Sequence, residues 1–128
     1  DKFFSTYAVG SLATALLFKA DSAGARQALA QAAPLIVRYG IGFRYAATAA
    51  LLAAHEGRWK ASAQLLGYGA AAAAAHGVDA DRPTEVMARD HALQRLAAHA
   101  GPDEVEAWKH QGSSLSVEEA YRLALVFG

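Results

Sequence analysis

Leu51 to Gly77, LLAAHEGRWKASAQLLGYGAAAAAAHG, is the stretch that decides the fold. It predicts the end of one helix, a tight turn at Glu56 and Gly57, and a second, alanine-rich helix that ends at Gly77. The apolar surface of this pair is too large for two helices to bury against each other, so helices on either side must cover it. The stretch carries no chemical motif, and we expect its buried face to form the core of the scaffold rather than a binding surface.

Length and composition predict a single all-α domain. The chain has 128 residues, of which 54% are hydrophobic, and it has only 3 prolines. Alanine dominates and β-branched residues are few, which favours close helix packing over a sheet. The lack of cysteine excludes disulfides and thiolate metal sites and is typical of a reducing compartment, so we expect a cytoplasmic protein.

The charge is balanced overall but unevenly distributed. Lysine plus arginine number 12, as do aspartate plus glutamate, so the chain as a whole has no electrostatic attraction for nucleic acid or anionic lipid. Residues 1–66 hold seven basic and three acidic side chains (+4), whereas residues 67–128 hold five and nine (−4). This polarity is suited to orienting neighbouring domains, but it does not specify a partner.

An uncharged run, FFSTYAVGSLATALLF, extends from Phe3 to Phe18 behind Lys2. A signal peptide or membrane anchor is the alternative to a buried helix here. The run has sixteen residues, short of the roughly 18 to 20 that span a bilayer, and it contains five hydroxyl side chains. We therefore expect a buried helix and no membrane contact. Because the chain starts at Asp1 rather than Met, we also expect it to be part of a larger protein.

Cap and turn residues divide the first half into four helices. Asp21 or Ser22 can cap the second helix through a side-chain oxygen. Pro34 should kink that helix or mark a new first turn, and Gly40 with Gly42 should close it. The four expected helices run from Phe3 to Phe18, from the cap to about Tyr39, from Phe43 to about His55 and from Trp59 to about His76.

A weak internal repeat links two of these helices. The phrase TALLFKADS, from Thr14 to Ser22, resembles AALLAAHEG, from Ala49 to Gly57, at an offset of 35 residues. An offset near 34 is the period of tetratricopeptide helix pairs, which stack in a right-handed array. Chance similarity is the alternative, because alanine and leucine are so common here and the Trp, Tyr and Pro marks of that repeat are largely missing.

The second half, residues 78–128, predicts three more helices. A polar loop, GVDADRP, precedes the first of them, with Asp81 as its cap and Pro83 in its first turn. Ser116 and Glu119 have capping-box spacing at the start of the last one. The expected helices are Pro83 to Ala100 with Val86, Leu93, Leu96, Ala97 and Ala100 on one stripe, a helix from Pro102 that buries Val105 and Trp108, and a helix from Ser116 with Val117, Ala120, Tyr121 and Ala124 on its apolar face. The result is about seven helices in antiparallel pairs, with residues 1–77 forming repeat-like pairs.

Several phrases, taken in order, resemble a known family. SAQLLGYGAAAAAAHG, from Ser62 to Gly77, looks like the A-x-L-L-G-x-A-x-x-L-x-x-x-x-G segment near the C-terminus of many large bacterial regulators. GPDEVEAW (101–108) and GSSLSVEEAYRLAL (112–125) follow in the order of that family's ending, which typically reads W, G, then L-S-x-E-E-A. These regulators combine a nucleotide-binding signalling ATPase, a helical-repeat array and a DNA-binding domain of the LuxR or winged-helix type.

The resemblance implies the C-terminal, tetratricopeptide-like region of a transcriptional regulator, without direct nucleic acid contact by this domain. Two departures from the pattern are present. Trp108 stands one residue further from Gly112 than in the usual form, and the acidic positions after L-L-G are alanine here. The order of the segments therefore counts for more than any one of them.

No motif indicates catalysis. GxxxxGK[ST], GxGxxG, GxSxG and HExxH are all absent from the sequence. Gly67 and Gly69 are interpreted as close helix contacts rather than a phosphate cradle, because no strand precedes them. We therefore predict no enzyme activity, no catalytic residues and no cofactor.

The histidines and the acidic residues have structural explanations. No pair among the histidines at 55, 76, 91, 99 and 110 has the four-residue spacing that presents two imidazoles to one zinc ion, so no metal site is expected. His55 and His76 lie near helix C-termini, where a cationic ring is favoured. Acidic residues between 103 and 119 fall in first turns, where they act as caps.

Basic and aromatic side chains gather at two places that form the candidate binding surface. Amphipathic surface residues explain this cluster without RNA or DNA. The candidate binding residues are Arg38, Tyr39, Arg44, Tyr45, Arg58, Trp59 and Tyr68. We expect the aromatic residues to be exposed and to form the surface through which the domain binds.

The leading hypothesis is a non-catalytic protein-interaction or effector-sensing domain of a bacterial transcriptional regulator. Its partners would be other domains of the regulator, a protein or peptide, or a small effector. A structural cap or homodimerisation module of a helical-repeat protein is the alternative. Small-molecule catalysis would instead require a deep pocket with two or more titratable groups of shifted pKa.

Overall fold

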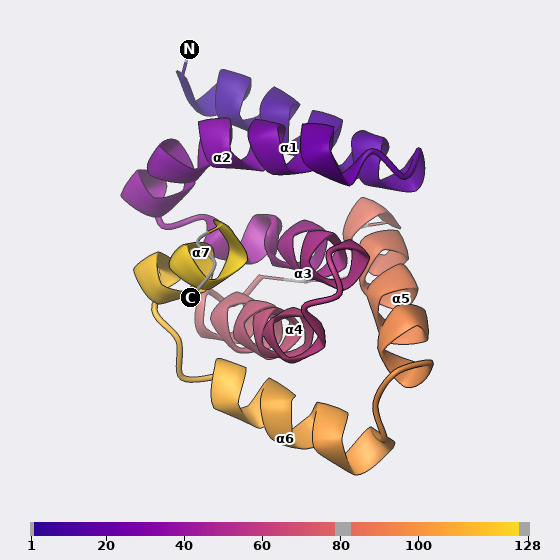
Figure 1. Ribbon diagram of the computed structural model, residues 1–128. Coiled ribbons are helices and arrows are strands. Elements are labelled where there is room, and N and C mark those ends of the chain that lie inside the picture. The colour runs from indigo at the N-terminus through magenta and orange to yellow at the C-terminus, as the bar shows by residue number, and fades with distance from the viewer. Residues whose placement is uncertain (1, 79–82, 126–128) are drawn as a thin grey trace.

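The computed structural model describes residues 2–78 and 83–125, the side chains of residues 2–7 excepted, and these residues form an all-helical bundle (Figure 1). The predicted all-α class is confirmed. None of the described helices has the length and apolar character that crossing a membrane requires. The elements are α1 (Lys2–Phe18), α2 (Ser22–Tyr39), a short 3₁₀ helix η1 (Gly42–Arg44), α3 (Ala46–His55), α4 (Trp59–Ala75), α5 (Pro83–Ala97), α6 (Pro102–Gly112) and α7 (Val117–Leu125).

Helix α3 lies at the centre of the bundle. Eight of its ten residues are buried, and it packs against α1, α2, α4, α5 and α7. A helix that is apolar on every side must be covered on every side. The prediction that further helices cover the Leu51–Gly77 pair is therefore confirmed.

Helices α1 and α2 form an antiparallel pair on one side of α3 (Figure 1). The carboxylate of Asp21 accepts the backbone N–H of Gly24 at 2.9 Å, which confirms the expected cap.

Helix α2 continues through Pro34 rather than restarting there. Pro34 is exposed, as is Ala30, so water can satisfy the carbonyl that the proline leaves without an N–H partner. Contrary to the expectation of a buried helix, α1 leaves Leu12 exposed.

Two helix boundaries differ from the sequence-based prediction. Phe43 and Arg44 belong to η1, and α3 begins only at Ala46. The hydroxyl of Tyr121 in α7 donates to the carbonyl of Gly42 at 2.7 Å, so a contact from far along the chain fixes this segment. Helix α5 ends at Ala97 rather than Ala100, because its last turn tightens into i→i−3 hydrogen bonds.

Among the helices of the second half, the cap predicted for α7 is present in the structure. Ser116 and Glu119 form the expected capping box: Glu119 accepts the Ser116 N–H at 2.9 Å, and the Ser116 hydroxyl accepts the Glu119 N–H at 3.1 Å. Asp81, the expected cap of α5, lies outside the described residues. Val105 is buried as expected, and Trp108 packs partly buried against the core.

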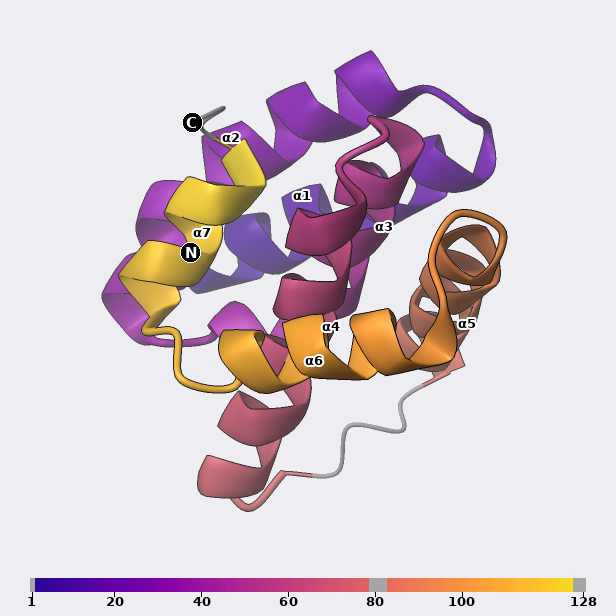
Figure 2. The same cartoon turned by 60° about the horizontal axis from the view of Figure 1, so that its bottom comes forward.

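Helix α6 lies directly on the backbone of α4. A methyl group at Gly67 would overlap the carbonyl of Lys109, and one at Gly112 would overlap the carbonyl of Gln64. The interpretation of Gly67 as a close helix contact is confirmed. Figure 2 shows α6 crossing α4, with the C-terminal part of α4 running past it out of the bundle.

The last three helices do not continue a simple series of pairs. Helix α5 packs on α3 and α6 packs on α4, but α5 and α6 make little contact with each other. Helix α7 packs against both α2 and α4 (Figure 2). The tetratricopeptide-like array therefore stays a prediction, while α1–α2 and α3–α4 are antiparallel pairs.

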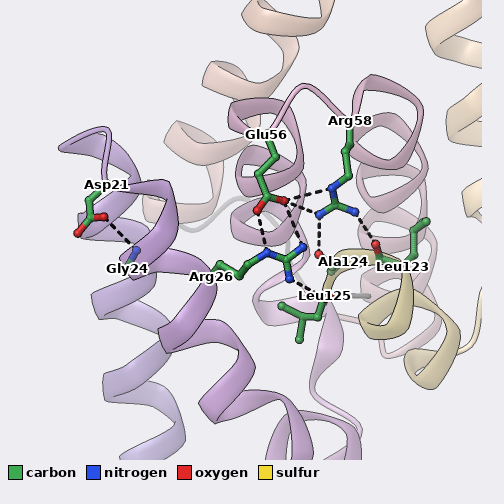
Figure 3. A network of polar contacts seen from close by, with 8 residues as sticks. All are labelled: Asp21, Gly24, Arg26, Glu56, Arg58, Leu123, Ala124 and Leu125. Atoms are coloured by element: carbon green, nitrogen blue, oxygen red, sulfur yellow. Dashed lines mark hydrogen bonds and ion pairs between the residues drawn. The ribbon is translucent and has the colours of Figure 1, made fainter. Parts of the chain in front are cut away.

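Two arginines and one glutamate tie the end of α7 to the rest of the bundle (Figure 3). Glu56, in the turn between α3 and α4, accepts from Arg26 Nε at 2.8 Å and from Arg58 Nη2 at 2.7 Å. The same guanidinium groups donate to the carbonyl oxygens of residues 123–125 at 2.6 to 2.7 Å. These carbonyls end a helix, where they have no partner within it and where cations are favoured. We call Arg26, Glu56 and Arg58 the arginine clamp.

Removing the carboxylate of the clamp should destabilise the fold. Glu56→Ala should lower the free energy of unfolding by about 1 to 3 kcal/mol, because two half-buried guanidinium groups lose their counter-charge. Urea denaturation followed by circular dichroism measures this change. Glu106→Ala is the control, since Glu106 is 72% exposed and pairs with Lys109 at 3.4 Å, a geometry that contributes little. Equal losses in the two variants would show that the clamp does not hold the fold.

Filling the contact between α4 and α6 should also destabilise the fold. Gly67→Ala should lower the free energy of unfolding by about 1 to 3 kcal/mol through overpacking. In an open helix interior the same change would raise stability by roughly 0.5 to 1 kcal/mol, so the sign of the effect identifies the contact. Ala74→Gly, at an exposed position of α4, calibrates helix propensity in the same urea experiment. A stabilised Gly67→Ala variant would contradict the close packing.

Candidate functional site

The seven candidate binding residues lie in several separate places. Arg38 and Tyr39 are exposed at the C-terminal end of α2. Arg58 belongs to the arginine clamp. Trp59 begins α4 and stacks on His99, with ring centroids 4.0 Å apart and an interplanar angle of 13°. Arg58 and Trp59 thus hold parts of the fold together, and a role for either in binding stays a prediction.

Tyr45 and Tyr68 are buried, with 6% and 4% of their surface exposed, whereas the sequence placed them on an exposed face. They lie close to the buried Tyr121 of α7. Burial, and then the charge of Glu118, raises the pKa of Tyr68 to about 12. Burial likewise raises the pKa of Tyr121 well above its ordinary value, with further contributions from Tyr68 and Tyr45. Tyr68 and Tyr121 therefore stay protonated near neutral pH.

Three helices that are distant in sequence enclose a polar pocket of about 250 Å³. Its walls come from α1, from the segment where η1 meets α3, and from the first turn of α5. The polar pocket is lined by Gly10, Ser11, Thr14, Arg44, Tyr45, Thr48, Pro83, Thr84 and Glu85. Arg44 and Tyr45 were candidates from sequence, and the structure adds the hydroxyl residues and Glu85.

Two buried threonines form one wall of the pocket. The hydroxyl of Thr14 donates to the carbonyl of Gly10 at 3.1 Å and lies 2.7 Å from the hydroxyl of Thr48. Each hydroxyl has one proton, so Thr48 must be the donor to Thr14. Thr48 then retains only acceptor lone pairs. This wall therefore offers hydrogen-bond acceptors to a ligand.

Arg44 brings a half-buried positive charge to the same pocket. Its guanidinium carbon lies 5.4 Å from the centroid of the Phe43 ring. Its buried Nε has no hydrogen-bond partner, and none of the carboxylates in residues 2–78 and 83–125 lies within ion-pair distance of it. A buried donor without a hydrogen-bond partner is costly. A hydrogen-bond acceptor on a bound ligand would offset that cost.

A second hollow, the apolar groove, lies between the end of α5 and the start of α6 and has a volume of about 320 Å³. It exists because these two helices make little contact with each other. The apolar groove is lined by Leu93, Leu96, Ala97, Ala100, Pro102, Val105 and Glu106. A single carboxylate at its rim gives it little power to orient a polar ligand.

His55, at the end of α3, lies near Arg95 and His91 of α5. Burial, then the charges of Arg95 and His91 on α5, lowers the pKa of His55. The expectation that a helix C-terminus favours its cationic form is therefore wrong, because burial and α5 outweigh the helix dipole. Nowhere in the described part of the chain do three or more His, Cys, Asp or Glu side chains gather in a way that could hold a metal ion.

The lowered pKa of His55 predicts a loss of stability in mild acid. Between its folded pKa and the ordinary value of 6.5, the unfolded chain binds more protons than the folded one, so stability falls as pH decreases through this window. His55→Gln should reduce the fall in unfolding free energy between about pH 7.5 and pH 5.5. His110→Gln, at an exposed position of α6, controls for histidine removal in general. An unchanged slope in His55→Gln would contradict the assignment.

Comparisons of the chain with protein-family models, with curated proteins and with solved structures found no match. The resemblance to the C-terminal region of bacterial regulators therefore stays a prediction.

Proposed function

We propose that this chain is a non-catalytic, effector-sensing domain of a bacterial transcriptional regulator, working in the cytoplasm through contacts with the regulator's other domains. The observation that carries the proposal is Arg44, which lies in the wall of the polar pocket and whose buried Nε has no hydrogen-bond partner among the described residues. The order of the regulator-like phrases from Ser62 onward adds independent support.

The position of the pocket suits a sensor. Its walls belong to the α1–α2 pair, to the α3–α4 pair and to α5, so one ligand contacts three parts of the bundle. Helix α5 packs on α3 but hardly on α6, which leaves α5 free to shift without moving α6. A ligand that binds one position of α5 more tightly will increase the population of that position.

The chemistry of the pocket favours binding over catalysis. Its hydroxyl groups come from Ser11, Thr14, Thr48, Thr84 and Tyr45, and among the residues that the structure describes no histidine, cysteine or lysine lines it. A serine or threonine nucleophile needs an adjacent base to be activated. The lining therefore resembles a recognition site, with one cation, one carboxylate and several hydroxyl groups.

Blocking the pocket should abolish effector binding. Thermal denaturation of the chain against a panel of metabolites should identify ligands that stabilise it, by about 2.7 kcal/mol at a hundredfold excess over Kd. Ser11→Tyr places a bulky ring at the exposed rim and should remove this stabilisation, whereas Ala15→Tyr, an exposed position of α1 outside the pocket, should retain it. A panel in which no ligand stabilises the chain, or one in which Ser11→Tyr responds like the unaltered chain, would overturn the proposal.

The alternative function, a structural cap or homodimerisation module, is favoured by the apolar groove between α5 and α6. Exposed apolar surface of this kind is often covered by a partner. Sedimentation velocity at several concentrations distinguishes the two functions. A concentration-dependent dimer that Ala97→Glu disrupts would support dimerisation through the groove, whereas a monomer that binds a ligand supports sensing.

A further inference from the structure

We propose that the apolar groove binds an amphipathic helix of a partner, with aliphatic side chains that enter the groove and with lysine or arginine along the edge that faces α6. This inference goes beyond the proposed sensing function, because it rests on a site whose described lining residues differ from those of the polar pocket. It follows from the shape of the groove, from its lining and from the charges beside it.

The groove is formed by two helices that are held separately. Helix α5 packs on α3 and helix α6 packs on α4, so each is positioned without help from the other. The turn that joins them is fixed by His99, whose ring stacks on Trp59 at the start of α4 with ring centroids 4.0 Å apart. Figure 1 shows the two helices meeting at this turn and diverging from it. A partner therefore binds without first having to order the groove, which avoids one of the costs of binding.

The lining of the groove matches the side chains of a helix. Leu93, Ala97 and Ala100 follow one another at spacings of four and three residues, and Val105 of α6 lines the same space. The stretch from Leu93 to Ala100 extends over about 10 Å, the length over which a docked helix presents anchors at i, i+4 and i+7. The volume of about 320 Å³ lies at the lower end of the roughly 300 to 1,000 Å³ typical of ligand pockets. The groove therefore takes a few aliphatic side chains rather than a large cofactor.

The charges beside the groove come mainly from α6 and are acidic. Helix α6 has three acidic side chains and one lysine, whereas α5 has two acidic and two basic side chains. Glu106 lines the groove, and Asp103 lies next to it on the helix surface, three residues earlier. Glu106 pairs with Lys109 at 3.4 Å, but an exposed pair of this kind contributes little. Asp103 has no ion-pair partner among the residues that the structure describes. A cationic edge on the bound helix is therefore attracted to α6.

The same charges disfavour the other occupants of such a groove. In a twofold dimer centred on the groove, the acidic edges of two copies share one interface and repel each other. A fatty acid or an anionic membrane surface also presents negative charge to this edge. A basic amphipathic helix is the occupant that both the apolar lining and the acidic edge favour.

Three matched peptides test the inference by calorimetry on the whole chain. Each has about sixteen residues, long enough for an alanine-based helix. The lysine peptide has leucine at i, i+4 and i+7 and lysine along one edge of this stripe. The glutamate peptide replaces its lysines by glutamate, and the glutamine peptide replaces its leucines by glutamine. We expect the lysine peptide to bind at least about tenfold more tightly than either of the others, and its affinity to fall as the salt concentration rises.

Variants assign the binding to the groove. Ala97→Arg places a long cationic side chain at an exposed position of the lining and should weaken binding of the lysine peptide at least about tenfold. Glu106→Lys should weaken binding of the lysine peptide and strengthen binding of the glutamate peptide. Glu118→Lys, the same change of charge at an exposed position of α7, should alter neither. Circular dichroism verifies that each variant is folded.

Three results would overturn the inference. The first is a lysine peptide that does not bind at about 1 mM, or that binds no more tightly than the other two peptides. The second is normal binding of the lysine peptide to Ala97→Arg. The third is a dimer in sedimentation experiments that Ala97→Arg disrupts, because a second copy of the chain then covers the groove. The sensing function is decided separately, by the metabolite panel and Ser11→Tyr.

Discussion

The contact between the backbones of α4 and α6 is the constraint on which the arrangement of the bundle depends. Gly67 and Gly112 lack the side chains that would separate the two helices, so α6 lies on α4 with carbonyl groups against glycine Cα atoms. Because α6 packs tightly on α4, it does not pair with α5, the helix that precedes it in the sequence. Helix α5 packs on α3 instead, and its first turn then forms a wall of the polar pocket. The apolar groove is the other consequence of this separation.

The small side chains of α3 allow its central position in the bundle. One contact of this helix is polar. Alanine lines most of this helix, so neighbours pack on it from several directions. Thr14 and Thr48 bond to each other where α1 meets α3, inside an otherwise apolar interface. Two apolar residues of similar volume would pack there without needing hydrogen bonds. The threonine pair therefore contributes more to the polar pocket than to the packing of α1 on α3.

Local signals predicted much of the fold, and long-range contacts account for what they missed. The cap at Asp21 and the left-handed turn at Gly57 act within a few residues, so the sequence alone locates them. The boundary at Phe43 was wrong because Tyr121, 79 residues away from Gly42, holds the preceding carbonyl. Tyr68 was expected among the exposed aromatic residues of the stretch from Arg58 to Tyr68. Its burial depends on where α7 packs, which no local pattern specifies.

The candidate site was predictable only in part, because its residues come together through long-range packing. Arg44 and Tyr45 stood out as a basic and an aromatic residue in an alanine-rich chain, whereas Thr14 and Thr48 resemble ordinary hydroxyl residues of a helix. The weak internal repeat does not find them, because at its offset of 35 residues Thr14 aligns with Ala49 rather than with Thr48. Their hydroxyl groups meet across the α1–α3 contact, which no local pattern specifies.

The charge asymmetry of the chain gives the pocket its character. Arg44 belongs to the half with a net charge of +4 and Glu85 to the half with a net charge of −4, and the fold places them on walls of one cavity. The cavity therefore carries one side chain of each charge sign, one from each half of the chain. The same asymmetry that gave no information about a partner at the level of the whole chain becomes specific once the fold brings these two residues to one site.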